Sequence, residues 1–116
     1  MAKQFVLYTL KDDRKDEDFI KWVNEYKGPF ITGLSAVKRY TITSVKRAMQ
    51  GRGGAPEVVD PPYKIAAVIE ITSVDDYVKN QESKPYKDEF MPEFVKWVKH
   101  FLILQADEVW WDKEHT

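Results

Sequence analysis

The sequence predicts an α+β domain in which four antiparallel strands form one sheet and the helices cover one of its faces. Two observations carry this prediction. Short runs of β-branched and aromatic residues alternate with amphipathic segments in the order β-α-β-β-α-β, the split βαβ order of ferredoxin-like folds. The length of 116 residues suits one domain spanning 1–116.

The first strand and the first helix occupy the N-terminal quarter of the chain. Residues 4–10 (QFVLYTL) are short, β-branched and aromatic, which predicts a strand. Asp16 is expected to cap a helix, and the pair Gly28 and Pro29 is expected to end it. The apolar side of this helix recurs at helical spacing: Phe19, Trp22, Val23 and Tyr26.

The second strand is predicted over residues 35–44, where the face with Tyr40 and Ile42 is the more apolar. Residues 48–62 are rich in Gly and Pro and predict a mobile loop. The GRGG run in this loop lacks the strand–loop–helix setting and the trailing Lys-Ser/Thr of phosphate-binding loops, so a solvated loop is favoured.

A third strand is predicted over residues 63–72, where Glu70 interrupts a nearly continuous apolar run. Ser73 and Asp76 have the spacing of a capping box at the start of a short helix. The helical pattern is interrupted at residues 81–85.

The second long helix is predicted over residues 86–99, with Pro92 marking either its true start or a kink. One stripe of this segment is apolar: Phe90, Phe94, Trp97, Val98 and Phe101. The final strand is predicted over 101–111, and residues 112–116 form a polar tail with His115.

Composition excludes several classes of protein. The chain has no cysteine, which excludes disulfides, Cys-based zinc sites and a Cys nucleophile. Two separated histidines make no metal site, and no dinucleotide fingerprint is present, so no metal or cofactor is expected. A net charge of −1 argues against nucleic acid, and no signal peptide or membrane-length apolar run is visible. We expect a cytoplasmic protein without membrane association.

The predicted helices leave one face of the sheet uncovered. Aromatic residues make up 14% of the chain, more than a small core needs. A second subunit is the simplest cover for the remaining face, so the sequence predicts a homodimer.

Four residues are candidates for acid–base chemistry. Glu70 is a carboxylate in an apolar strand, although an ion pair with Arg39 would explain it equally. His100 lies among aromatic residues and titrates near neutral pH, although it can instead satisfy a helix C-terminus. Arg39 could hold an anionic oxygen, and the Tyr40 phenol could donate to a carbonyl, although surface contacts and packing are the commoner roles.

Six aromatic side chains are candidate walls of a pocket for a small aromatic or hydrophobic substrate, with core packing as the alternative. They are Tyr8, Trp22, Tyr26, Phe90, Phe94 and Trp97.

A family resemblance runs through most of the chain. It is carried by residues 19–22 (FIKW), 28–30 (GPF), 34–40 (LSAVKRY), 63–71 with Glu70, and the helix-to-strand passage at 90–104. These segments resemble the dimeric α+β-barrel superfamily, in which two sheets pack face to face with the helices outside. Within it, the chain is most similar to RedY/HapK-like and EthD-like proteins.

The resemblance implies a cofactor-independent tailoring enzyme of secondary metabolism. Such an enzyme would cyclise, dehydrate or isomerise an aromatic, pyrrole-, indole- or polyketide-type intermediate. A non-catalytic binding or delivery protein and a cofactor-free monooxygenase are the alternatives. Many EthD-like sequences carry histidines in the first helix, where this chain has Asn24, Tyr26 and Lys27, so a mechanism centred on those histidines does not transfer.

Overall fold

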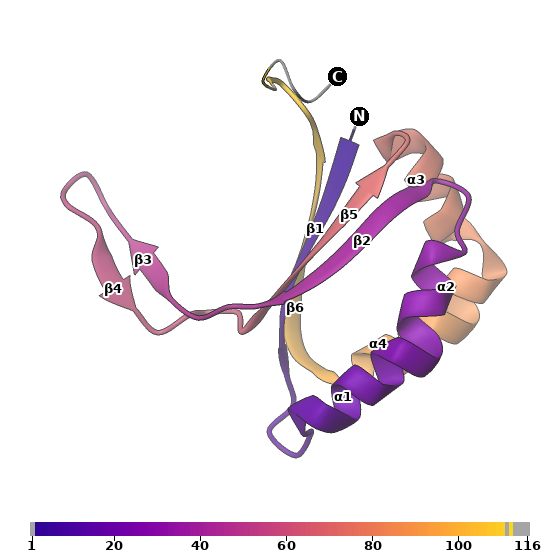
Figure 1. Cartoon of the computed structure of the whole chain (residues 1–116), viewed down its shortest axis with the longest axis horizontal. Coiled ribbons are helices and arrows are strands. Elements are labelled where there is room, and N and C mark those ends of the chain that lie inside the picture. The colour runs from indigo at the N-terminus through magenta and orange to yellow at the C-terminus, as the bar shows by residue number, and fades with distance from the viewer. Residues whose placement is uncertain (1, 111, 113–116) are drawn as a thin grey trace.

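The predicted α+β architecture is confirmed by the computed structural model, which describes residues 2–110 and 112 (Figure 1). Four antiparallel strands form the main sheet in the ferredoxin-like spatial order β2-β5-β1-β6. Their bounds are Val37–Ser44 for β2, Ile65–Ile71 for β5, Ala2–Leu10 for β1 and Val98–Asp107 for β6. Strands β5 and β1 are therefore the two central strands of the sheet, and β2 and β6 are its edges.

Two helical stretches cover one face of this sheet (Figure 1). The first stretch consists of α1 (Asp16–Trp22), a π-helical segment η1 (Val23–Lys27) and α2 (Gly28–Thr32). The second consists of α3 (Val74–Glu82), a π-helical segment η2 (Pro85–Phe90) and α4 (Met91–Val95). The expectation that Gly28 and Pro29 end the first helix is wrong, since the helix continues to Thr32.

Each π-helical segment precedes a proline. Pro29 and Pro92 have no backbone N–H, and in a regular α-helix the ring would also collide with the carbonyl four residues earlier. The wider turn avoids that collision, with the Gly28 N–H donating to the Val23 carbonyl and the Met91 N–H to the Tyr86 carbonyl. A proline that was expected to stop a helix thus widens it instead.

Successive residues along the strands of the main sheet alternate between two environments. In β1 every second residue from Ala2 to Leu10 is buried beneath the helices, and the residues between them are half-buried on the opposite face. The same alternation in β5 buries Ala67, Ile69 and Ile71. The hydrophobic core therefore lies entirely between the helices and one face; we call the other face the open face.

The Gly- and Pro-rich region of residues 48–62 is not a simple loop, which corrects the sequence prediction. Strands β3 (Ala48–Gln50) and β4 (Glu57–Val59) pair antiparallel and form a separate two-stranded sheet. Gly53, with a φ of 81°, supplies the left-handed conformation that the turn between them requires. We call residues 48–59 the arm, because Figure 1 shows this hairpin extending away from the sheet.

Several element boundaries differ from the prediction. The last helix ends at Val95, and Val98 begins β6, because Val98 and His100 pair with Leu10 and Thr9 of β1. This sheet pairing overrides the helical spacing of the apolar residues. Strand β6 ends at Asp107; the predicted strand end at Trp111 and the tail residues 113–116 lie outside the described residues.

The two predicted helix caps have opposite outcomes. Ser73 Oγ accepts a hydrogen bond from the Asp76 N–H at 3.0 Å, which confirms the cap of α3. The cap position of α1 is Lys15, not Asp16, and it makes no side-chain hydrogen bond.

Candidate functional site

A lysine lies inside the apolar layer between the helices and the sheet. Lys27, at the end of η1, is only 4% exposed. Its Nζ donates a hydrogen bond of 2.9 Å to the Tyr8 hydroxyl and lies 4.6 Å from the centre of the Tyr8 ring and 4.9 Å from that of Phe94. No salt bridge to Lys27 occurs among the described residues. Burial without a charged partner lowers the pKa of Lys27 to about 7.

The phenols around Lys27 are held in their neutral form. Burial raises the pKa of Tyr8 above its ordinary value, and burial also raises the pKa of Tyr40. The Tyr40 hydroxyl is buried without a hydrogen-bond partner among the described residues, while the Lys27 Nζ lies 5.7 Å from its ring. Near pH 7 the site therefore combines an amine that is about half in its neutral form with two phenols that can donate a proton.

Further polar groups line the same interior. A cavity of about 20 Å³, large enough for one water molecule, lies among Gln4, Lys27, Tyr40, Tyr77 and other residues. The Tyr77 hydroxyl is buried without a hydrogen-bond partner among the described residues. Burial raises the pKa of Tyr77, and the nearby Tyr86 and Gln4 side chains also influence it. A water-sized cavity with unsatisfied hydroxyls is a place where a substrate oxygen could be recognised.

A larger groove opens beside this interior. It has a volume of about 590 Å³, within the range of small-molecule sites. Phe19, Val23, Ile42 and other apolar residues form part of its walls. Charged and hydroxyl-bearing residues line the rest, and the charged ones are Lys11, Asp12, Arg14, Asp16 and Lys64. Phe19 belongs to both sites, because its ring lies 5.6 Å from the Lys27 Nζ. The groove therefore ends at the wall behind which Lys27 lies.

The aromatic residues predicted to line a pocket mostly pack against one another. Trp22 stacks on Trp97 at 5.4 Å between ring centres, and Tyr26 lies 6.2 Å from Phe90. Phe90 and Phe94 border the small cavity, whereas none of the six lines the groove. Two of the six contact the Lys27 amine: Tyr8 accepts its hydrogen bond, and the Phe94 ring lies 4.9 Å from it.

Of the four predicted acid–base residues, only Tyr40 lies in the helix-side interior. Glu70 lies on the open face, opposite Lys3, where the Arg39 Nε is 4.0 Å from its carboxylate. This is the ion pair that the sequence offered as the alternative for Glu70. His100 pairs with Thr9, six residues along β1 from Lys3, so about 20 Å separates Glu70 from His100. The structure therefore does not join these two residues in one site.

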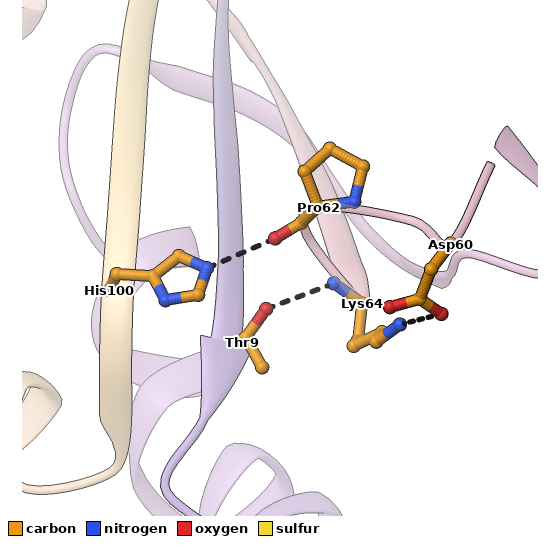
Figure 2. Close-up of polar contacts among 5 residues, drawn as sticks. All are labelled: Thr9, Asp60, Pro62, Lys64 and His100. Atoms are coloured by element: carbon orange, nitrogen blue, oxygen red, sulfur yellow. Dashed lines mark hydrogen bonds and ion pairs between the residues drawn. The ribbon is translucent and has the colours of Figure 1, made fainter. Parts of the chain in front are cut away.

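His100 makes its polar contact at the base of the arm (Figure 2). Its Nε2 lies 3.0 Å from the Pro62 carbonyl oxygen, which can only accept a hydrogen bond, so Nε2 carries the proton. The Tyr63 ring packs against the imidazole edge at 5.2 Å. This geometry gives His100 a positioning role rather than contact with the groove or the buried cavity.

Sequence analysis missed Lys27 because it assumed regular α-helical spacing. Tyr26 follows Phe19 by seven residues and would share its face in an α-helix. The π-helical segment η1 adds one residue to the turn, which brings Lys27 to that buried face and leaves Tyr26 half-buried. The proline at position 29, within a helical pattern, was the available signal.

The fold and this helix-side site define a ferredoxin-like α+β protein with a lysine buried in its apolar interior beside a groove. The family model described as REDY-like protein HapK matches residues 2–109. The chain therefore belongs to the HapK family of REDY-like proteins. No curated protein matches the chain in sequence.

Solved structures show the same fold at low identity. HapK from Hahella chejuensis has a TM-score of 0.66 and 17% identity, covering 97% of this chain and 98% of that one. A hydroxynitrile lyase from Passiflora edulis has a TM-score of 0.68 and 13% identity, covering 96% of each chain. A dimeric ferredoxin-like protein of unknown function from Thermobifida fusca has a TM-score of 0.64 and 13% identity, covering 92% and 90%.

Two further features of the described residues, 2–110 and 112, bear on the class of site. Within this part of the chain, no group of three or more His, Cys, Asp and Glu side chains is placed to hold a metal ion. No helix there is long and apolar enough to cross a membrane.

Proposed function

We propose that this protein is a cofactor-independent acid–base enzyme that acts on a small aromatic or hydrophobic substrate. The observation that carries the proposal is the pair of Lys27 Nζ and Tyr8 hydroxyl, 2.9 Å apart in an apolar interior. The Phe19 ring, which lies 5.6 Å from the Lys27 Nζ, separates this pair from the 590 Å³ groove. A buried amine with a pKa of about 7 accepts and returns protons near neutral pH.

The proposed roles follow from the protonation states. Neutral Lys27 removes a proton from a carbon or oxygen of the substrate, and the Tyr8 or Tyr40 phenol donates to a carbonyl or leaving oxygen. Tyr40 suits this role because its hydroxyl has no partner among the described residues and would gain one from the substrate. These steps support a cyclisation, dehydration or isomerisation of an aromatic, pyrrole-, indole- or polyketide-type intermediate in secondary metabolism.

Similar folds support the proposal of an enzyme. The Passiflora edulis neighbour is a hydroxynitrile lyase, which shows that this fold can carry catalysis. The HapK family match agrees with the resemblance from which the tailoring reaction is inferred, and the reaction itself stays a proposal. The nearly closed interior excludes bulk water, which strengthens the interaction of Lys27 and Tyr8 with developing charge.

We further propose that the protein is a homodimer whose two open faces pack together. On the open face, Phe5, Leu7, Val68, Leu102 and Leu104 form an apolar area, and Leu102 and Leu104 are 40% and 46% exposed. The Thermobifida fusca protein with this fold is dimeric, which supports the proposal.

The test of the enzyme compares Lys27→Met with Glu70→Gln and His100→Ala, which change two of the four acid–base candidates named from the sequence. The probe reaction is deuterium exchange from D₂O into the α-position of indole-3-acetaldehyde, followed by NMR. We expect the wild type to accelerate exchange, Lys27→Met to lose at least 100-fold of that rate, and the other two variants to stay within threefold. Equal rates for Lys27→Met and the wild type would remove Lys27 from the mechanism.

Ligand binding separates the enzyme from a delivery protein. Trp22 and Trp97 lie close to the interior and report binding by fluorescence. If the wild type binds the probe but exchanges no deuterium above the buffer rate, catalysis is refuted for this probe class and the delivery function is favoured.

A further inference from the structure

The strands of the arm do not pair with the main sheet of their own chain. Strands β3 and β4 pair only with each other among the described residues, and Figure 1 shows the hairpin far from the helices. The radius of gyration is 15.7 Å. A compact domain of this length would have about 13 Å, so the arm extends the molecule well beyond a globular outline.

An isolated hairpin of this size needs a surface to pack against. Two strands of three residues each are at best marginally stable in water. Met49 and Val58 lie directly opposite each other and are 53% and 61% exposed. Because strand residues alternate in direction, Met49 and Val58 form an apolar side of the arm, and Gln50 and Glu57 lie on its other side.

The base of the arm is held in a fixed direction (Figure 2). His100 Nε2 donates to the Pro62 carbonyl at 3.0 Å, and the Lys64 N–H donates to the Thr9 Oγ1 at 3.2 Å. The Lys64 Nζ lies 2.8 Å from an Asp60 carboxylate oxygen, and the Val45 N–H donates to the Lys64 carbonyl at 2.8 Å. The first two contacts tie the segment that follows β4 to β6 and β1, and the Val45–Lys64 hydrogen bond joins the segment that precedes β3 to it.

The arm leaves the main sheet in a direction away from the helices (Figure 1). Figure 1 shows the helices on one side of the main sheet and the arm projecting from the other. The open face, with its exposed Leu102 and Leu104, is on that same side. A second copy seated on the open face would therefore meet the arm.

We propose that the arm is a dimerisation arm, whose Met49–Val58 side packs against a second copy of this chain seated on the open face. The inference rests on the proposed homodimer and adds the surface that secures it. Thr43, Ser44, Lys64 and Ile65 line the groove just before and after the arm. Packing of the arm therefore also fixes one rim of the groove, which links dimer formation to the site.

The first test is the dissociation constant of the dimer, measured by sedimentation over a concentration series. The variant Met49→Ser/Val58→Ser removes the apolar side of the arm, and Gln50→Ala/Glu57→Ala is the matched control on its other side. We expect the first variant to raise the dissociation constant at least tenfold and the control to change it less than threefold. Circular dichroism should be unchanged in both, because the arm lies outside the core.

The outcomes separate the inference from the homodimer on which it rests. A wild type that stays monomeric at all concentrations overturns the homodimer and the arm together. A dimeric wild type whose dissociation constant is unchanged in Met49→Ser/Val58→Ser overturns the dimerisation arm alone.

A second test places the arm directly. The chain has no cysteine, so Met49→Cys carries a single benzophenone maleimide without further changes. The labelled protein is mixed with ¹⁵N-labelled wild type, irradiated and digested for mass spectrometry. We expect cross-links from the labelled residue to ¹⁵N peptides of the open-face strands; cross-links confined to the labelled residue's own chain would overturn the proposal.

Discussion

The two faces of the main sheet use the same strands for different purposes. The helix side buries a lysine, several phenols and an aromatic stack, and the groove ends there. The open face carries the more conspicuous polar residues, Glu70, Arg39 and His100, together with exposed leucines. The comparison teaches that the chemical group to look for is the one whose burial changes its proton affinity, not the charge that stands out in a strand sequence.

The largest expected effect is on the free energy of unfolding when a charge is placed on the helix side of β5. Ile69 and its neighbour Val68 face opposite sides of the sheet and allow the two faces to be compared. Ile69 is 2% exposed under the helices, whereas Val68 is half-buried on the open face. Ile69→Asp would place a carboxylate in the core and cost at least about 4 kcal/mol, enough to unfold a marginally stable domain. Urea unfolding followed by circular dichroism measures this cost.

Val68→Asp is the matched variant on the open face. We expect it to leave the monomer folded and to raise the dimer dissociation constant by more than 100-fold, because a charge enters the proposed interface. Sedimentation measures the constant. If Val68→Asp unfolds the chain as Ile69→Asp does, the two faces do not differ in the way described here.

The next effect is the pH dependence that Lys27 gives to stability. In the folded protein the pKa of Lys27 is about 7, whereas the unfolded chain keeps the ordinary value near 10.4. Between these values the unfolded state binds more protons, so stability rises with pH, by about 2–3 kcal/mol from pH 6 to pH 9.

Lys27→Met should remove this rise. Urea unfolding of both proteins at pH 6, 7.5 and 9 gives the two free energies of unfolding at each pH. Parallel curves for the two proteins would show that Lys27 keeps an ordinary proton affinity, and the acid–base role would lose its physical basis.

The smallest expected effect is on the free energy of unfolding when one of two buried hydroxyls on the helix side is removed. Tyr8→Phe removes the acceptor of the Lys27 hydrogen bond and should cost about 1–2 kcal/mol at pH 6. Tyr40→Phe removes a hydroxyl without a partner among the described residues, so stability should stay unchanged or rise by up to about 1 kcal/mol. Equal losses in the two variants, measured by urea unfolding, would show that Tyr40 has a bonding partner such as a buried water.

The sequence predicts the main sheet well because its strands repeat every two residues and its helices carry wide apolar stripes. It also offers the Arg39–Glu70 ion pair as the alternative explanation for a carboxylate in an apolar strand, and the structure contains this pair. It could not place His100 and Glu70 about 20 Å apart on one face, because that separation depends on the register of β1 against two different strands. The sequence also could not predict the pairing of Met49 with Val58, because the Gly and Pro residues around them indicate a loop.

The widened turn before Pro29 has a consequence for how such a site can arise. A lysine one position beyond the buried stripe of a regular helix is an ordinary surface residue. One additional residue in the turn rotates everything that follows it, so that the same lysine faces the core while the helix keeps its length and its partners. The wider turn before Pro29 therefore decides whether residue 26 or residue 27 faces the core, without any substitution at position 27 itself.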